Sequence, residues 1–86
     1  MINTEQFKEW MKDNTSYSDA VIGDNVSRMK RADSILEWSG DETYLFYLEK
    51  EKTFLELTVS VRSQLRKAVK LYSAYSEALS KAEKNG

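Results

Sequence analysis

Basic residues in two short groups are the part of this chain most suited to binding chemistry. No acidic residue lies between Leu57 and Ser76, so the second group has no near neighbour of opposite charge. The groups are Arg28, Lys30 and Arg31, and Arg62, Arg66, Lys67 and Lys70. Lysine and arginine neutralise phosphates, and the arginine fork also contacts base edges. If both groups face one side, they form a surface for duplex DNA.

The alternative interpretation is that these cations only solvate helix surfaces, which is the usual role of exposed charges. A helix that is merely soluble normally mixes charge signs to gain pairs four residues apart. Residues 49–52 mix signs in this way, whereas residues 58–75 carry only positive charge. The sequence therefore favours a binding surface. A rival hypothesis is a helical protein-interaction or oligomerisation module that exposes Trp38, Tyr47 or Phe54 as anchors.

Total charge hides this distribution. The 86 residues include 13 basic and 14 acidic side chains, for a net charge of −1. Residues 1–43 carry five basic and nine acidic groups, a net of −4, and residues 44–86 carry eight and five, a net of +3. We therefore expect any attraction to nucleic acid to be local and modest.

The chain lacks the side chains that most often carry out catalysis or bind zinc. The chain has no histidine and no cysteine, which excludes a histidine base, a cysteine nucleophile and a His/Cys zinc site. The pair Asp41 and Glu42 is typical of a helix start, and Glu49 and Glu51 of solvated surface. We predict no catalytic residue, no metal, no cofactor and no enzymatic activity.

The sequence contains no stretch typical of a targeting signal. The N-terminus lacks a basic segment followed by an apolar run, and no stretch approaches the roughly 20 apolar residues of a membrane span. We expect a cytoplasmic protein without a membrane partner.

Four helices in an all-α bundle are predicted to carry these side chains, because apolar residues recur at steps of three and four and proline is absent. The first helix begins at Asn3, with Gln6 completing a capping box and Ile2 packing on Phe7. The second begins at Ser18. Its apolar stripe is Ile22, Val26, Met29 and Leu36.

Asp33 falls on that stripe, where an unpaired carboxylate is costly. Either the helix ends near Ala32 and Asp33 caps a further turn, or its side chain finds a cationic partner. Asp41 and Glu42 are expected to open the third helix, and residues 53–59 to form a connection that packs on the core and is partly extended. The fourth helix is predicted from the stripe Val61, Leu65, Ala68, Tyr72, Tyr75 and Leu79.

Domain boundaries follow from the same pattern. Residues 1–80 are predicted to form a single four-helix domain. Residues 81–86, KAEKNG, no longer follow the apolar stripe, and we expect a tail or a linker to a C-terminal domain.

The order of these segments resembles the N-terminal core-binding domain of tyrosine recombinases, the phage-integrase type with a SAM-like four-helix fold. The resemblance rests on packing and capping positions in FKEWMKDN, YSDAVIGDNVSRMKRA and SVRSQLRKAVKLYSAY. They are Ser18 with Ile22, and Leu65, Ala68, Tyr72 and Tyr75.

The resemblance implies a domain that clamps one side of a DNA duplex with its second and fourth helices, the two helices that carry the basic groups. It also implies a separate, covalently linked effector domain that performs DNA recombination. The catalytic Arg, His and Tyr residues of that family lie in the separate domain, so no catalytic role carries over to this chain.

Overall fold

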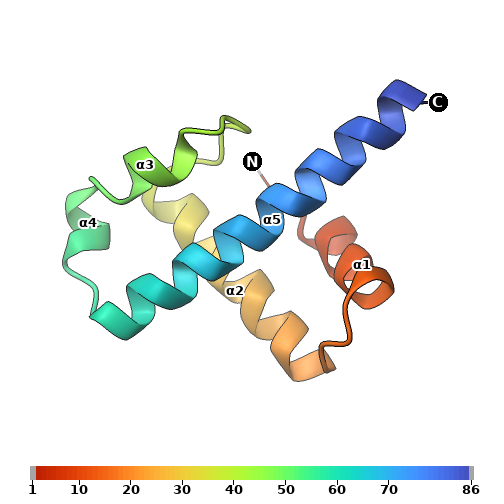
Figure 1. Cartoon of the computed structure of the whole chain (residues 1–86). Coiled ribbons are helices and arrows are strands. Elements are labelled where there is room, and N and C mark those ends of the chain that lie inside the picture. The colour runs from red at the N-terminus through yellow and green to blue at the C-terminus, as the bar shows by residue number, and fades with distance from the viewer. Residues whose placement is uncertain (1, 86) are drawn as a thin grey trace.

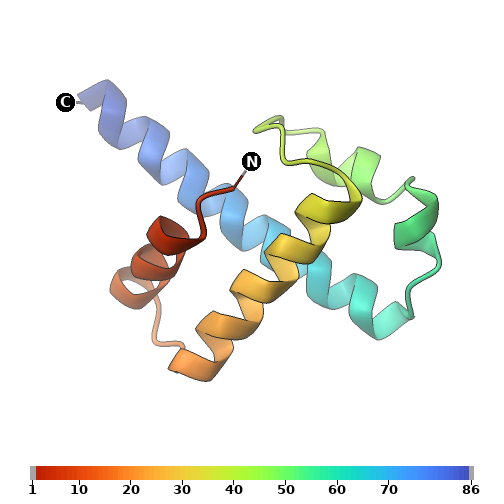
Figure 2. The ribbon, with the colours of Figure 1, turned by 180° about the vertical axis from the view of Figure 1, so that it is seen from behind.

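Two long helices, α2 (Asp19–Ile35) and α5 (Val59–Asn85), form the centre of the structure. The computed structural model describes residues 2–85, with side chains through residue 82. One end of the pair is covered by α1 (Thr4–Asn14), and α3 (Tyr44–Leu48) and α4 (Lys52–Leu55) lie at the other end (Figure 1, Figure 2). The described residues contain no strand, which confirms the all-α class, but they form five helices where four are predicted.

The additional helix, α4, occupies the first part of the connection predicted for residues 53–59, and residues 56–58 link it to α5. Its sequence is rich in residues that favour strands, but one helical turn buries Phe54 completely in the core. Burial of an aromatic side chain outweighs the small helix penalty of its neighbours. Packing of this segment on the core is confirmed, but a partly extended form was wrong for residues 53–55, because local preference does not include the burial of Phe54.

The start of α3 also differs from the prediction, since the helix begins at Tyr44 and not at Asp41. Asp41 instead closes a turn before the helix, where its carboxylate accepts bonds from the Thr43 backbone N–H and hydroxyl, both at 2.9 Å. These two bonds hold the pKa of Asp41 below its usual range. Gly40 supports the turn with a φ of 76°, which favours glycine.

The start of α1 is capped as predicted by Asn3, whose side chain accepts the Gln6 backbone N–H at 3.0 Å. The reciprocal half of the predicted capping box does not form. The Asn3 N–H donates to the Tyr72 hydroxyl, and the Gln6 side chain accepts from the Tyr75 hydroxyl, both at 3.0 Å. Bonds to α5 thus replace a local bond and attach the beginning of α1 to α5.

The two alternatives for Asp33 are resolved by the end of α2. Ser18 caps the start of this helix as predicted, and the helix continues past Ala32 to Ile35. Asp33 therefore lies inside α2, and its carboxylate accepts the Trp38 backbone N–H at 2.8 Å. Asp33 caps the turn that follows the helix, and no ion pair with a described cation is formed.

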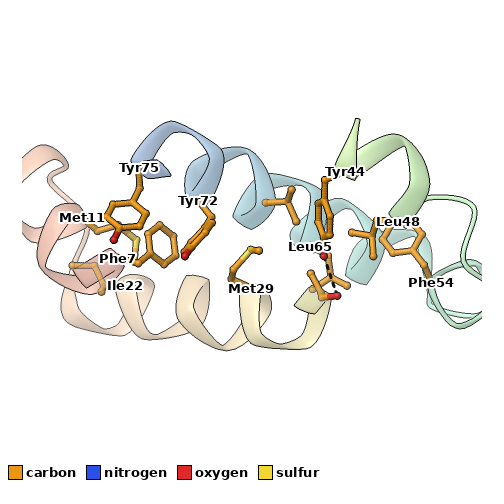
Figure 3. Close-up of a cluster of buried hydrophobic side chains, with 12 residues drawn as sticks. Phe7, Met11, Ile22, Met29, Tyr44, Leu48, Phe54, Leu65, Tyr72 and Tyr75 are labelled. Carbon is orange, nitrogen blue, oxygen red and sulfur yellow. Dashed lines mark hydrogen bonds between the residues drawn. The ribbon is translucent and has the colours of Figure 1, made fainter. Parts of the chain in front are cut away.

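The core is a continuous strip between α2 and α5 (Figure 3). Side chains from α1 fill the strip at one end, side chains from α3 and α4 fill it at the other, and Met29 lies between the two groups. The labelled residues are Phe7, Met11, Ile22, Met29, Tyr44, Leu48, Phe54, Leu65, Tyr72 and Tyr75.

The stripe predicted for the last helix is buried over most of its length. Leu65, Ala68, Tyr72 and Tyr75 are each at most 5% exposed. Leu79 is 42% exposed and lines a shallow depression beside the start of α1. The helix also continues through residues 81–85, where a tail or linker is predicted; Gly86 lies outside the described residues. A connection to a further domain stays a prediction.

Tyr44 provides the first testable prediction, because its hydroxyl donates to the carbonyl oxygens of Leu36 at 2.6 Å and Ala32 at 3.1 Å. Tyr44→Phe leaves these carbonyls at the end of α2 without that donor. We expect the free energy of unfolding at neutral pH to fall by about 0.5–1.5 kcal/mol, measured by urea denaturation. An unchanged value would contradict this role for the hydroxyl.

Tyr44→Phe should also change how the free energy of unfolding depends on pH. Burial, together with the negative charge of Asp33, raises the pKa of Tyr44 to about 12. The stabilisation is fully present below about pH 10, where the unfolded phenol ionises, and is lost as the pH rises towards about 12. Tyr44→Phe should therefore lose stability less steeply than the original chain over that interval.

Candidate nucleic-acid interface

A groove of about 500 Å³ lies between α2 and α5. Three cations line it: Arg28 from α2, and Lys67 and Lys70 from α5. The two lysines are one helical turn apart, so they lie on the same face of α5. No acidic side chain is among the lining residues. Packing of two distant segments thus collects positive charge in one place.

The remainder of the groove was not predicted. Its walls include the apolar side chains of Val21, Leu71 and Ala74, and Tyr17 lines it with 45% of its surface exposed. Asn25 lines it as well and is only 7% exposed. A usable signal was present in the sequence, because Asn25 stands three residues after Ile22 and four before Met29 and so occupies a core position with a polar amide.

Two of the predicted cations on α2 lie away from this groove. Lys30 and Arg31 are exposed and do not line it. Residues two apart on an α-helix are separated by about 200° around the axis, so Lys30 points away from Arg28. The seven predicted cations therefore do not share a single groove.

Arg66 is engaged in a structural contact. Its guanidinium donates from Nε to the Glu49 carboxylate, and its centre lies 5.5 Å from the Phe54 ring centroid. This contact joins α5 to the chain around α3 and α4, and the carboxylate neutralises the charge of Arg66. Arg62 is half-buried, and its Nε is enclosed without a hydrogen-bond partner among the described residues.

Acidic side chains gather around a different depression. A hollow of about 330 Å³ is lined by Asp41, Glu42 and Glu77 together with Trp38 and serines of α5. Within residues 2–85, no group of three or more His, Cys, Asp or Glu side chains is placed to hold a metal ion. The acidic residues are thus separate from the basic groove.

Comparison with known proteins gives no relative. No protein-family model matches the chain, and no curated protein or solved structure matches it. None of the described helices combines the length and apolar character needed to cross a membrane.

The contact between Glu49 and Arg66 can be tested by a double-mutant cycle in alanine. Both side chains are more than one-third exposed, so we expect a coupling energy of about 0.2–1 kcal/mol in urea unfolding. Arg66→Ala should destabilise more than Glu49→Ala, because it also removes the cation from above Phe54.

The matched control is the pair Glu9 and Lys12 on α1, whose charged atoms are 3.9 Å apart and whose side chains are more exposed. This pair should show the smaller coupling energy. An equal or larger coupling for Glu9 and Lys12 would contradict a structural role for Arg66.

Proposed function

We propose that this chain is a non-catalytic DNA-binding domain of the core-binding, SAM-like type, which clamps duplex DNA through α2 and α5. The observation that carries the proposal is the convergence of Arg28, Lys67 and Lys70 on one groove without an acidic lining residue. Phosphate contacts supply most of the affinity, because such contacts dominate binding by basic surfaces.

Exposed Lys30 and Arg31 extend the positive charge outside the groove and reach phosphates further along the duplex. Arg62 lies one turn before Arg66 and adds positive charge to α5, the helix that carries the groove lysines. Arg66 contributes least, since Glu49 already neutralises it. The domain acts within a longer DNA-acting protein, such as an integrase or recombinase, whose covalently linked effector domain performs the chemistry.

The groove lysines provide the decisive test of this proposal. We expect Lys67→Ala combined with Lys70→Ala to weaken binding of a fluorescein-labelled duplex in fluorescence anisotropy. Measured between about 50 and 200 mM salt, the slope of log affinity against log salt should fall by about 2, since each phosphate that is no longer neutralised reduces it by about 0.9.

The matched control is Lys8→Ala combined with Lys81→Ala, which removes the same charge from exposed positions on α1 and α5 outside the groove. This variant should keep most of the affinity and the slope. Absence of binding at about 50 mM salt, or an equal decrease of affinity in both double variants, would refute the proposal.

A protein-interaction or oligomerisation module is the second candidate, and exposed apolar side chains favour it. Phe46 and Tyr47 on α3 are 55% and 56% exposed, and their rings meet edge to face at 5.4 Å. Leu55 and Val59 are also exposed, at 55% and 71%. Of the three anchors expected for this module, Tyr47 is exposed, Trp38 is half-buried and Phe54 is fully buried.

Sedimentation velocity over a range of concentrations separates the two candidates. A DNA-binding domain of this kind should sediment as a monomer at every concentration, and Phe46→Ser combined with Tyr47→Ser should not change its sedimentation coefficient. Association that rises with concentration and is abolished by this double variant, in a chain without DNA affinity, would favour the second candidate.

A further inference from the structure

Asn25 is a buried amide without a partner. It is 7% exposed, and its side chain forms no hydrogen bond with any other described residue. The polar atoms of its amide are not fully enclosed by protein. They are accessible from the groove between α2 and α5, which Asn25 lines. Buried polar groups are normally hydrogen-bonded, because leaving them unpaired is costly. An amide placed in this way can donate to and accept from a ligand that enters the groove.

The groove combines four kinds of surface. Val21 and Leu71 provide apolar walls, Tyr17 provides an exposed aromatic ring, and Asn25 provides both a donor and an acceptor. Arg28, Lys67 and Lys70 supply the charge. A phosphate alone uses the cations and leaves the apolar walls in water, whereas an uncharged aromatic molecule leaves the cations unused. A nucleotide uses all four kinds of surface.

The size of the groove is consistent with such an occupant. Its volume of about 500 Å³ falls within the usual range for pockets that bind small molecules or single groups of larger ones, about 300–1,000 Å³. Bases of an intact duplex are stacked and present only their edges, so they cannot enter a groove between two protein helices. Only a base that has left the stack can reach Asn25.

We infer that this groove receives one unstacked nucleotide of DNA, an inference that rests on the DNA-binding function proposed above. The base packs against Leu71 and Val21 and stacks on Tyr17, while its edge bonds to the Asn25 amide. Phosphates on either side of the base contact Arg28, Lys67 and Lys70. An asparagine amide pairs with N6 and N7 of adenine through one donor and one acceptor, so adenine is the expected base.

The experiment compares three labelled duplexes of the same sequence by anisotropy: one fully paired, one with a single unpaired adenine, and one with an abasic nucleotide at that position. The abasic duplex controls for bending of the DNA. We expect the unpaired adenine to increase affinity about tenfold over both other duplexes, since an unpaired base is easily extruded and its edge is read by Asn25.

Two variants test the assignment of residues. Asn25→Ala should lower the affinity for the duplex with the unpaired adenine to that for the abasic duplex. Tyr17 is exposed, so we expect Tyr17→Ser to fold normally. This variant should reduce the same preference for adenine. Lys67→Ala combined with Lys70→Ala should weaken binding of all three duplexes alike.

Equal affinities for the three duplexes, with the dependence on Lys67 and Lys70 retained, would overturn the inference and leave the proposed DNA-binding function intact. A preference for adenine that survives both Asn25→Ala and Tyr17→Ser would also overturn it. Absence of binding to every duplex at about 50 mM salt would refute the proposed function itself.

Discussion

Tyr72 lies at a junction of three parts of the chain. Its ring meets Phe7 of α1 at 4.9 Å and Trp38 of the loop after α2 at 5.1 Å, both edge to face. Its hydroxyl accepts the Asn3 N–H at the start of α1. Aromatic pairs of this geometry contribute about 0.5–1.5 kcal/mol each beyond the burial of their surface. Tyr72 therefore links this loop to α5, and together with Tyr75, which contacts Phe7 and Trp10, it holds α1 against α5.

Burial of Tyr72 also determines where the cations of α5 lie. Lys70 precedes Tyr72 by two residues, so its side chain points about 200° away from the aromatic cluster. Lys67, one turn earlier, shares that direction. Because Tyr72 faces the core, these lysines face outward, and the packing of α2 beside them brings Arg28 to the same groove. The hydrophobic core thus positions a polar site in which it takes no direct part.

Local rules were sufficient for the long helices. The caps Asn3 and Ser18 are predicted correctly, since capping involves only residues within one turn. Prediction failed where a distant residue competes with a local interaction. Gln6 bonds to Tyr75 in place of Asn3, and Phe54 is drawn into the core as part of an additional helix. Such outcomes depend on side chains far away in the sequence, which no local window contains.

By itself, the sequence determined an all-α chain, the buried stripe on its last helix and the absence of histidine and cysteine chemistry, because periodicity and composition are properties of the chain alone. Only the tertiary structure decided which cations meet. Arg28 joins Lys67 and Lys70, Lys30 points elsewhere, and Arg66 pairs with Glu49. The reason is geometric: the face that a helix presents to a neighbour is set by how both helices bury their apolar sides, and that is known only when they are packed together.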